Sequence, residues 1–417
     1  MAKQFNIPSF YDSSIIRTVK QARQAVDPRK KDLSAVMLDF GPVQFYIPRH
    51  FGFCYGVQNA IDIAYRTIDE ANGRNVYLLS EMIHNPVVND DLQRRGVKFL
   101  FETNGHENIP IDSLSNEDIV IVPAFGTTLE IEERLKGRGI DPYAWNTTCP
   151  FVEKVWKRGA QLGTKGYNLV IHGKVKHEET RATFSHAKND SRAVVVVLNV
   201  AEAKFLAECM QGMQPQSAFE AVFEGKCTPG FDPRRDLQRF GVINQTTMLA
   251  TETQEVIDVL RAAAIELYGE ANIENHVADT SDTLCYATNE NQSATLELMK
   301  ENLDAALVVG GFNSSNTMHI VELLERVVPT FHVRGGIDMP DPGIIRHYNQ
   351  WEHAERETSD WLDFSKNPIR IGVTSGASCP DALVDEVMLK ILSWVDGALD
   401  VDSALEPLRR QIDSVAT

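Results

Sequence analysis

The chain has 417 residues and a formal net charge of -17 at pH 7. At about 150 residues per domain, this length predicts two or three domains with ample hydrophobic core. The negative charge disfavours nucleic acid or an anionic membrane as the main partner, because both are themselves anionic. No run of about 18 apolar residues occurs, and the first residues lack the apolar segment of a signal peptide, so we expect a cytoplasmic protein.

Residues 1–42 predict an N-terminal extension of mixed charge, partly helical near residues 15–20, which we interpret as an accessory arm. Beyond it, short apolar runs typical of parallel strands covered on both faces alternate with helical segments. These runs occupy residues 43–47, 76–79, 119–122, 169–171, 193–197, 241–243, 306–309 and 369–373. The pattern predicts an α/β fold.

A weak internal repeat accompanies these strands. Small and hydroxylated residues follow the runs that end near residues 122, 243, 309 and 373, and an acidic helix comes next. Such side chains are ordinary N-caps when taken singly, but several converging on one cleft would form an anion pocket. Neither a G-x-G-x-x-G fingerprint nor a P-loop occurs, so a nucleotide is not the favoured anion.

Cys54 lies between two glycines, Gly52 and Gly56, after the apolar run 43–47 and before an alanine-rich amphipathic segment. This order predicts a strand, a tight turn and a helix. A helix N-terminus lowers the pKa of a thiol, and the glycines let a bulky partner approach the backbone. Cys54 is therefore a candidate reactive or metal-ligating residue, the alternative being a buried cysteine that packs as a small hydrophobe.

Two further cysteines, Cys149 and Cys285, also occur at predicted helix starts. Three thiolates without a fourth ligand suit an iron-sulfur cluster whose remaining iron is open to substrate. Cys209 and Cys227 are not at predicted helix starts, and Cys379 is only partly in such a context. The turn around Cys379 is better interpreted as facing a phosphate through its neighbour Ser378.

Two histidine segments complete the candidate site. His84 precedes a turn, and His177 and Glu179 follow the predicted strand 169–171 at its carboxyl end, where open α/β sheets bind ligands. A carboxylic acid beside an anion and a metal cluster can serve as a general acid. The alternative is that the histidines are satisfied polar residues and that Glu179 caps a helix or pairs with Lys176.

Eight motifs in order carry a resemblance to a known family: Gly-Phe-Cys-x-Gly-Val, Ile-His-Asn-Pro-x-Val, Thr-Cys-Pro-x-Val, His-x-Glu-x-Thr, Gln-Thr-Thr, Asp-Thr-x-Cys-x-Ala-Thr, Asn-Ser-Ser-Asn and Gly-Ala-Ser-x-Pro. From about residue 44 to 395 the chain closely resembles the 4-hydroxy-3-methylbut-2-enyl diphosphate reductases. Members reduce that allylic diphosphate to isopentenyl and dimethylallyl diphosphate, the last step of the methylerythritol phosphate route to isoprenoids. The resemblance implies an electron donor such as ferredoxin or flavodoxin.

The resemblance also implies a trefoil of three α/β domains with small, mostly parallel sheets around a central cleft. The expected domains are residues 43–148, 149–280 with an insertion at about 190–233, and 281–395, followed by a tail at 396–417; residues 43–54 are candidates to pack with the third domain. A second insertion is expected around residues 351–361, and the long architecture resembles the cyanobacterial and plastid-like branch.

By motif position, the resemblance assigns roles to individual residues. A 4Fe-4S cluster would be held by Cys54, Cys149 and Cys285, and Glu179 would deliver the proton. The diphosphate and the allylic chain would be held by His84, His177, Thr246, Ser314, Ser315, Asn316 and Ser378. Phe125 stands where many members have a histidine, so one diphosphate contact is expected to be lost or replaced.

Two other functions are compatible with three thiols. A cluster-bearing redox sensor would use the same cysteines but would not need the Ser/Thr/Asn loops or Glu179. A cluster-dependent hydro-lyase would remove water without net reduction, so a requirement for external electrons separates it from a reductase.

Overall fold

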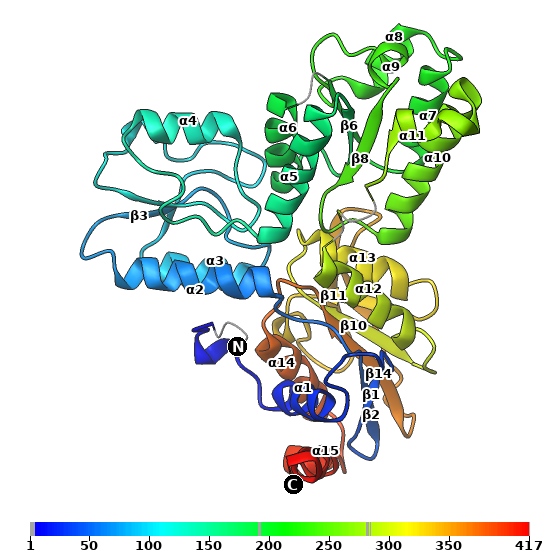
Figure 1. Cartoon of the computed structure of the whole chain (residues 1–417). Coiled ribbons are helices and arrows are strands. Elements are labelled where there is room, and N and C mark those ends of the chain that lie inside the picture. Colours follow the sequence, from blue (N-terminus) through cyan, green and yellow to red (C-terminus); the bar gives the residue numbers. More distant parts are fainter. Residues whose placement is uncertain (1–4, 191–192, 281–282, 284, 417) are drawn as a thin grey trace. The chain divides into compact units, whose positions relative to one another are not determined.

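The protein is an α/β protein, described by a computed structural model over residues 5–190, 193–280, 283 and 285–416. Its chain forms two compact units (Figure 1). Unit 1 comprises Met1–Gln58, His84–Val87 and Tyr286–Thr417, and unit 2 comprises Asn59–Ile83 and Val88–Cys285. Asp282 and Leu284, which belong to the third cysteine motif, lie outside the described residues.

Unit 1 is built on a five-stranded sheet in the order β1-β2-β14-β10-β11, parallel except for the β1–β2 pair. The strands are β1 (Val36–Asp39), β2 (Val43–Ile47), β10 (Ala305–Val309), β11 (Thr330–Val333) and β14 (Ile369–Ser375), with a separate hairpin of β12 (Ile344–Asn349) and β13 (Ala354–Ser359). The helices are α1 (Ile15–Val26), α12 (Tyr286–Leu298), α13 (Ser315–Leu324), α14 (Asp381–Leu392) and α15 (Val401–Ala416), with 3-10 turns η1 (Ser9–Tyr11) and η4 (Gly336–Asp338).

The central strand β10 shows why the runs of this chain are apolar throughout. All five of its residues are buried. Leu307 and Val309 pack into one core with residues of α1, α14 and α15, whereas Ala306 and Val308 pack into a second core with residues of α12 and α13. Since successive side chains point to opposite faces, a strand covered on both faces needs apolar residues at every position.

The N-terminal extension is part of the core of unit 1, which corrects its interpretation as an accessory arm. The apolar face of α1 buries Ile15, Ile16, Val19 and Ala22 in the core shared with α14 and α15. At the start of α1 the backbone N–H groups of residues 15 and 16 donate to the buried carboxylate of Asp385, at 3.0 and 3.1 Å. A carboxylate from α14 thus satisfies donors that a helix N-terminus leaves open and interacts favourably with its dipole.

We expect Asp385→Ala to release α1 from the sheet. The substitution removes two buried charge-assisted hydrogen bonds. It should therefore lower the free energy of unfolding of unit 1 by about 2–4 kcal/mol. Urea unfolding gives the magnitude, and faster hydrogen exchange at the amides of residues 15 and 16 localises it. Asp402→Ala is the matched control, because Asp402 makes an exposed ion pair with Arg409 that contributes little. Equal effects in the two variants would contradict the assignment.

Unit 2 holds two parallel sheets, in the orders β4-β3-β5 and β7-β6-β8-β9. The strands are β3 (Val76–Leu78), β4 (Lys98–Phe99), β5 (Ile119–Ile121), β6 (Asn168–His172), β7 (Val194–Val197), β8 (Phe240–Asn244) and β9 (Val277–Ala278). Its helices are α4 (Leu129–Gly137), α5 (Pro150–Thr164), α6 (Glu178–Asp190), α7 (Val200–Met210), α8 (Gln216–Phe223), α9 (Pro233–Asp236), α10 (Ala250–Tyr268) and α11 (Ile273–His276), with 3-10 turns η2 (Ile111–Ser113) and η3 (Glu270–Asn272). Two more helices, α2 (Tyr55–Asp69) and α3 (Pro86–Arg94), begin in unit 1 and continue into unit 2.

Helices cover both faces of the larger sheet of unit 2 (Figure 1). Val194 and Val196 of β7 pack with residues of α5 and α6, and Val195 and Val197 pack with residues of α7 and α10. Every apolar run interpreted as a strand forms one, with boundaries that agree within two residues. No helix in the described part of the chain has the length and apolar character needed to cross a membrane.

Candidate functional site

One group of predicted site residues lies in unit 1, where the neighbouring parallel strands β10 and β14 end. The loop after β10 carries Ser314, Ser315 and Asn316 into the start of α13, and the loop after β14 carries Ser378 toward α14. Parallel strands place their carboxyl ends at one edge of a sheet, and ligands of open α/β sheets bind at that edge. The repeated strand, hydroxyl loop and helix of the sequence therefore deliver their polar side chains to one place.

Short contacts connect these loops to the segment that carries His84. The Oγ of Ser378 donates to the backbone carbonyl of His84 at 3.2 Å and lies 3.4 Å from the Oγ of Ser314. The amide of Asn313 is 3.3 Å from Nδ1 of His84. Gly311 makes this approach possible, because a Cβ at that position would lie 2.4 Å from the His84 carbonyl oxygen. His84, Ser314 and Ser378 thus form one polar group.

Asn316 shows that this group has hydrogen-bonding capacity to spare. Its side-chain oxygen accepts from the backbone N–H of Ala377 at 2.8 Å and from the amide of Asn291 at 3.4 Å. Its amide nitrogen is buried and has no hydrogen-bond partner in the described structure. An unpaired buried donor carries a cost of about 1–3 kcal/mol, which an anion with several oxygens would remove. Donors of this kind at the start of α13 suit a phosphate group.

A second group lies in unit 2, where the neighbouring parallel strands β6 and β8 end. Residues after β6 include His177 and Glu179, the latter at the start of α6, and Thr246 follows β8. Glu179 is 2% exposed, and its two carboxylate oxygens accept hydrogen bonds from the backbone N–H of Thr246 at 2.5 Å and from its hydroxyl at 2.9 Å. This pairing fixes the plane of the carboxylate and places a hydroxyl that can accept or donate a proton against it.

His177 is held in one orientation by two neighbours. Its Nδ1 accepts a hydrogen bond from the backbone N–H of Glu179 at 3.2 Å, which leaves Nε2 as the nitrogen that carries the proton in the neutral ring. Phe125 packs edge-on against the imidazole, with ring centroids 5.8 Å apart. The residue at the position of the family histidine therefore supports His177 by packing.

Each of the three candidate cysteines directly precedes a helix. Cys54 comes before α2, Cys149 is the N-cap residue of α5, and Cys285 comes before α12. The predicted helix starts are confirmed. Gly52 adopts a left-handed φ of +76°, and a Cβ there would lie 2.3 Å from a carboxylate oxygen of Asp381, so only glycine fits the turn that leads to Cys54.

The other cysteines sit in different surroundings. Cys209 and Cys379 are buried in hydrophobic cores, and Cys227 packs against the first of these cores. Burial raises the pKa of Cys209 to about 11 and also raises those of Cys227 and Cys379. Because a thiolate is the form that binds iron, these three thiols are poor ligands. Their surroundings agree with the distinction made from the sequence.

No three His, Cys, Asp or Glu side chains are gathered as a metal site within the described residues. Cys54 belongs to unit 1, whereas Cys149 and Cys285 belong to unit 2. The donor chemistry nevertheless fits an iron-sulfur cluster, since the three thiols occupy helix starts, where the helix dipole favours the thiolate form.

A comparison with known protein families shows to which family the chain belongs. The family model described as LytB protein matches residues 46–392. This chain belongs to the LytB family. The match confirms the resemblance drawn from the eight motifs, and it includes the three candidate cysteines and every candidate substrate residue.

Curated relatives of this LytB protein share a name. A 4-hydroxy-3-methylbut-2-enyl diphosphate reductase of Gloeobacter violaceus is 36% identical over 93% of this chain and 89% of its own length. The enzyme of that name from a Picosynechococcus strain is 38% identical over 85% of each chain. A solved E-1-hydroxy-2-methyl-but-2-enyl-4-diphosphate reductase from Plasmodium falciparum aligns with a TM-score of 0.60 and 19% identity over 90% of this chain and all of that one, which supports the fold.

Residues outside the predicted set also contribute to the two groups of this LytB protein. Asn313 contacts His84, and as the first residue of the Asn-Ser-Ser-Asn motif it was within reach of sequence reasoning. Gln245, from the Gln-Thr-Thr motif, accepts from the hydroxyl of Thr180 at 2.9 Å and so ties the loop after β8 to α6. Asn291 lies inside α12 and belongs to none of the eight motifs. Its contact with Asn316 is the observation that places it at the site.

Proposed function

We propose that this chain reduces (E)-4-hydroxy-3-methylbut-2-enyl diphosphate to isopentenyl and dimethylallyl diphosphate, the last step of the methylerythritol phosphate pathway. Two groups of polar side chains support this most directly. The group after β10 and β14 in unit 1 suits a diphosphate, and the group after β6 and β8 in unit 2 suits proton delivery. Membership of the LytB family, whose curated relatives carry this activity in their names, adds to it. A cytoplasmic location and the three-domain division at about residues 148 and 280 belong to the same proposal.

The reaction is a reductive dehydroxylation. The carbon–oxygen bond of the terminal alcohol breaks, two electrons and two protons are taken up, and water and the reduced allylic diphosphate are formed. A 4Fe-4S cluster held by Cys54, Cys149 and Cys285 would supply the two electrons, one at a time, and Lewis acidity. The chain's own residues then bind the diphosphate, orient the alcohol and move a proton.

Binding of the diphosphate is assigned to His84, Ser314, Ser315, Asn316 and Ser378. The N-terminus of α13 contributes backbone N–H groups and its dipole, and the amide nitrogen of Asn316 contributes an unpaired donor. The diphosphate carries the same charge in the ground state and in the transition state. These donors therefore contribute to the affinity for the substrate and not to the rate of the chemical step.

Proton delivery is assigned to Glu179 with Thr246. A protonated Glu179 can donate to the Thr246 hydroxyl, which in turn can donate toward the leaving hydroxyl, so that it departs as water. His177 is assigned to the substrate, with Nε2–H as the donor, because Nδ1 accepts from the backbone N–H of Glu179.

Anaerobic purification tests the proposal. The expected protein is brown, contains iron and acid-labile sulfide, and converts the allylic diphosphate to both products with an external electron source. Activity in colourless, iron-free protein would refute the cluster assignment. Loss of water without electron consumption would indicate a hydro-lyase.

We expect Asn316→Ala to raise the KM for the diphosphate by about ten- to a hundredfold with little change in kcat, since hydrogen bonds to charged groups are worth about 1.5–3 kcal/mol. Ser314→Ala should act alike, although it also removes the N-cap of α13 and so costs about 1 kcal/mol of stability. Steady-state kinetics with a small artificial donor make the measurement.

Ser393→Ala is the control for these two variants, because Ser393 is exposed in the same unit and only contacts its own helix. It should leave both kinetic constants unchanged. A lower kcat with an unchanged KM in Asn316→Ala would count against a diphosphate role.

A further inference from the structure

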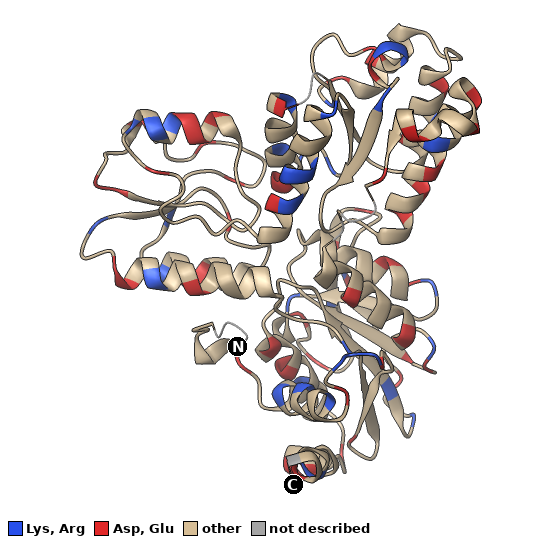
Figure 2. Cartoon of the chain, in the orientation of Figure 1, with Lys and Arg blue, Asp and Glu red and all other residues tan. Residues whose placement is uncertain are grey.

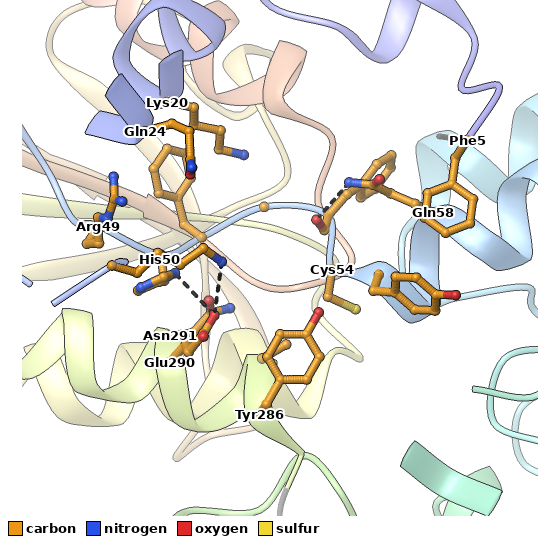
Figure 3. A pocket seen from close by; sticks show the side chains of 16 residues that line it. Phe5, Lys20, Gln24, Arg49, His50, Cys54, Gln58, Tyr286, Glu290 and Asn291 are labelled. Carbon is orange, nitrogen blue, oxygen red and sulfur yellow. Dashed lines mark hydrogen bonds and ion pairs between the residues drawn. The ribbon is translucent and has the colours of Figure 1, made fainter. Parts of the chain in front are cut away.

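A pocket of about 400 Å³ opens beside Cys54 in unit 1 (Figure 3). Cys54 itself lines it, and so do Tyr286 and Ala287, the two residues that follow Cys285 in the chain. None of the residues assigned to the diphosphate or to proton delivery lines it. The pocket therefore reaches one proposed cluster ligand, Cys54, and the residues assigned to the substrate do not line it.

The wall of this pocket is locally basic in an acidic chain. Its cationic side chains are Lys20, Lys30 and Arg49, against one lining acid, Glu290; Lys20 pairs with Asp381 at 2.7 Å, and Lys30 lies 3.9 Å from Glu290. Helix α1, which supplies Lys20, carries basic residues and no acid along its whole length (Figure 2). Burial, together with the nearby Lys30 and Arg49, lowers the pKa of His50 to about 4, as expected where the local potential is positive.

Large side chains at the rim are partly exposed, although the Tyr55 ring packs edge-on against Phe5. Tyr55 is 40% exposed and Tyr286 is 38% exposed, and the Lys30 side chain is 48% exposed. Tyrosines flanked by cationic side chains are typical of the centre of a protein–protein interface. Electron-transfer complexes are formed over small areas and rely on charge complementarity for orientation.

We propose that this pocket is the docking site of the electron donor, a small protein with acidic side chains around its redox centre. The proposal rests on the proposed function, which requires two successive one-electron deliveries to a cluster beside Cys54. A chain with a net charge of -17 repels an acidic partner over most of its surface, so a patch with more cations than acids favours an approach that brings the donor to Cys54. Each encounter oxidises one donor by one electron, and two encounters complete one turnover.

The test uses the cluster-loaded enzyme and an acidic [2Fe-2S] ferredoxin as the probe. Lys30→Glu reverses an exposed charge at the rim, and Gln24→Glu adds one on the exposed face of α1 without a change of shape. The control is Lys204→Glu, the same charge reversal at an exposed position of α7 in unit 2. Ferredoxin binding is measured by calorimetry, and turnover is measured with reduced ferredoxin and with reduced methyl viologen.

We expect Lys30→Glu to weaken ferredoxin binding and raise the KM for ferredoxin by about tenfold at low salt, and Gln24→Glu by about two- to threefold, with smaller effects at about 0.5 M salt. Lys204→Glu should change neither, and viologen-driven turnover should be normal in all three. Unchanged ferredoxin binding in both pocket variants, or an equal loss in Lys204→Glu, would overturn the proposal. Calorimetry measures ferredoxin binding independently of turnover, so it tests the docking site alone. Failure of the wild-type enzyme to reduce the diphosphate with viologen would instead refute the proposed function.

Discussion

Replacement of Cys54, Cys149 or Cys285 by serine is expected to leave a folded protein that holds no stable 4Fe-4S cluster. Each of these thiols directly precedes a helix, where the dipole favours the thiolate, and a serine hydroxyl is a far weaker ligand for iron. Because three thiolates are the whole of the proposed protein ligand set, loss of one leaves two. Iron and acid-labile sulfide per chain should fall close to zero in each variant, and turnover should fall with them.

Cys209→Ser and Cys227→Ser are the matched controls. Cys209 is buried in a hydrophobic core inside α7, Cys227 packs against the same core, and neither directly precedes a helix as the three candidate ligands do. A hydroxyl in place of the Cys209 thiol costs some stability, because it is polar and buried, but the iron content should equal that of the wild type. Equal iron content across all five variants would refute the ligand assignment, and circular dichroism would show whether a variant without iron is still folded.

Local features of the chain could be predicted from the sequence because their causes are local. A buried parallel strand needs an uninterrupted apolar run, so β6, β8 and β10 were recognisable within a few residues. The same holds for the three helices that begin after the candidate cysteines. The polar loops after these strands were recognised as possible anion sites because each follows a strand in the same order.

Contacts between distant segments could not be predicted. The hydrogen-bond acceptor for the first turn of α1 is Asp385, 370 residues further along the chain. No residue of the mixed-charge extension indicates this partner. The N-terminal segment was therefore misjudged as an accessory arm. The same limit applies to Phe125, because its ring contact with His177 joins two distant segments and could not be foreseen from the sequence, while the lost or replaced diphosphate contact stays a prediction.

Glu179→Gln is expected to lower turnover by two orders of magnitude or more, within the roughly 10²–10⁴-fold range of general acid catalysis. The amide keeps the size of the side chain, and its oxygen can still accept from the backbone N–H of Thr246. The Thr246 hydroxyl can reverse its role and accept from the new NH₂ group. Fold, cluster content and KM for the diphosphate should therefore be preserved while the acid proton is lost.

Glu178→Gln provides the control, because it makes the same chemical change at the neighbouring buried position of α6, whereas Glu179 is the carboxylate that accepts from the N–H and the hydroxyl of Thr246. It should retain most of the wild-type rate. Turnover should be driven by a strong artificial donor, so that electron supply does not limit the rate, and a spectroscopic check should show that the cluster still responds to substrate.

A second variant distinguishes proton delivery from a role in holding the helix. Thr246→Val keeps the shape of the side chain but removes the hydroxyl that donates to Glu179 and that the proposed proton relay requires. If the two residues act as one relay, Thr246→Val should be slow as well, and the double variant should be little slower than Glu179→Gln alone, because groups that act as a unit are not additive. If Glu179 only holds the loop after β8 against α6 through its buried hydrogen bonds, Glu179→Gln should lower stability by about 1 kcal/mol and leave turnover near normal. Near-normal turnover would therefore move the search for the proton source to Thr246 itself and to a phosphate of the substrate.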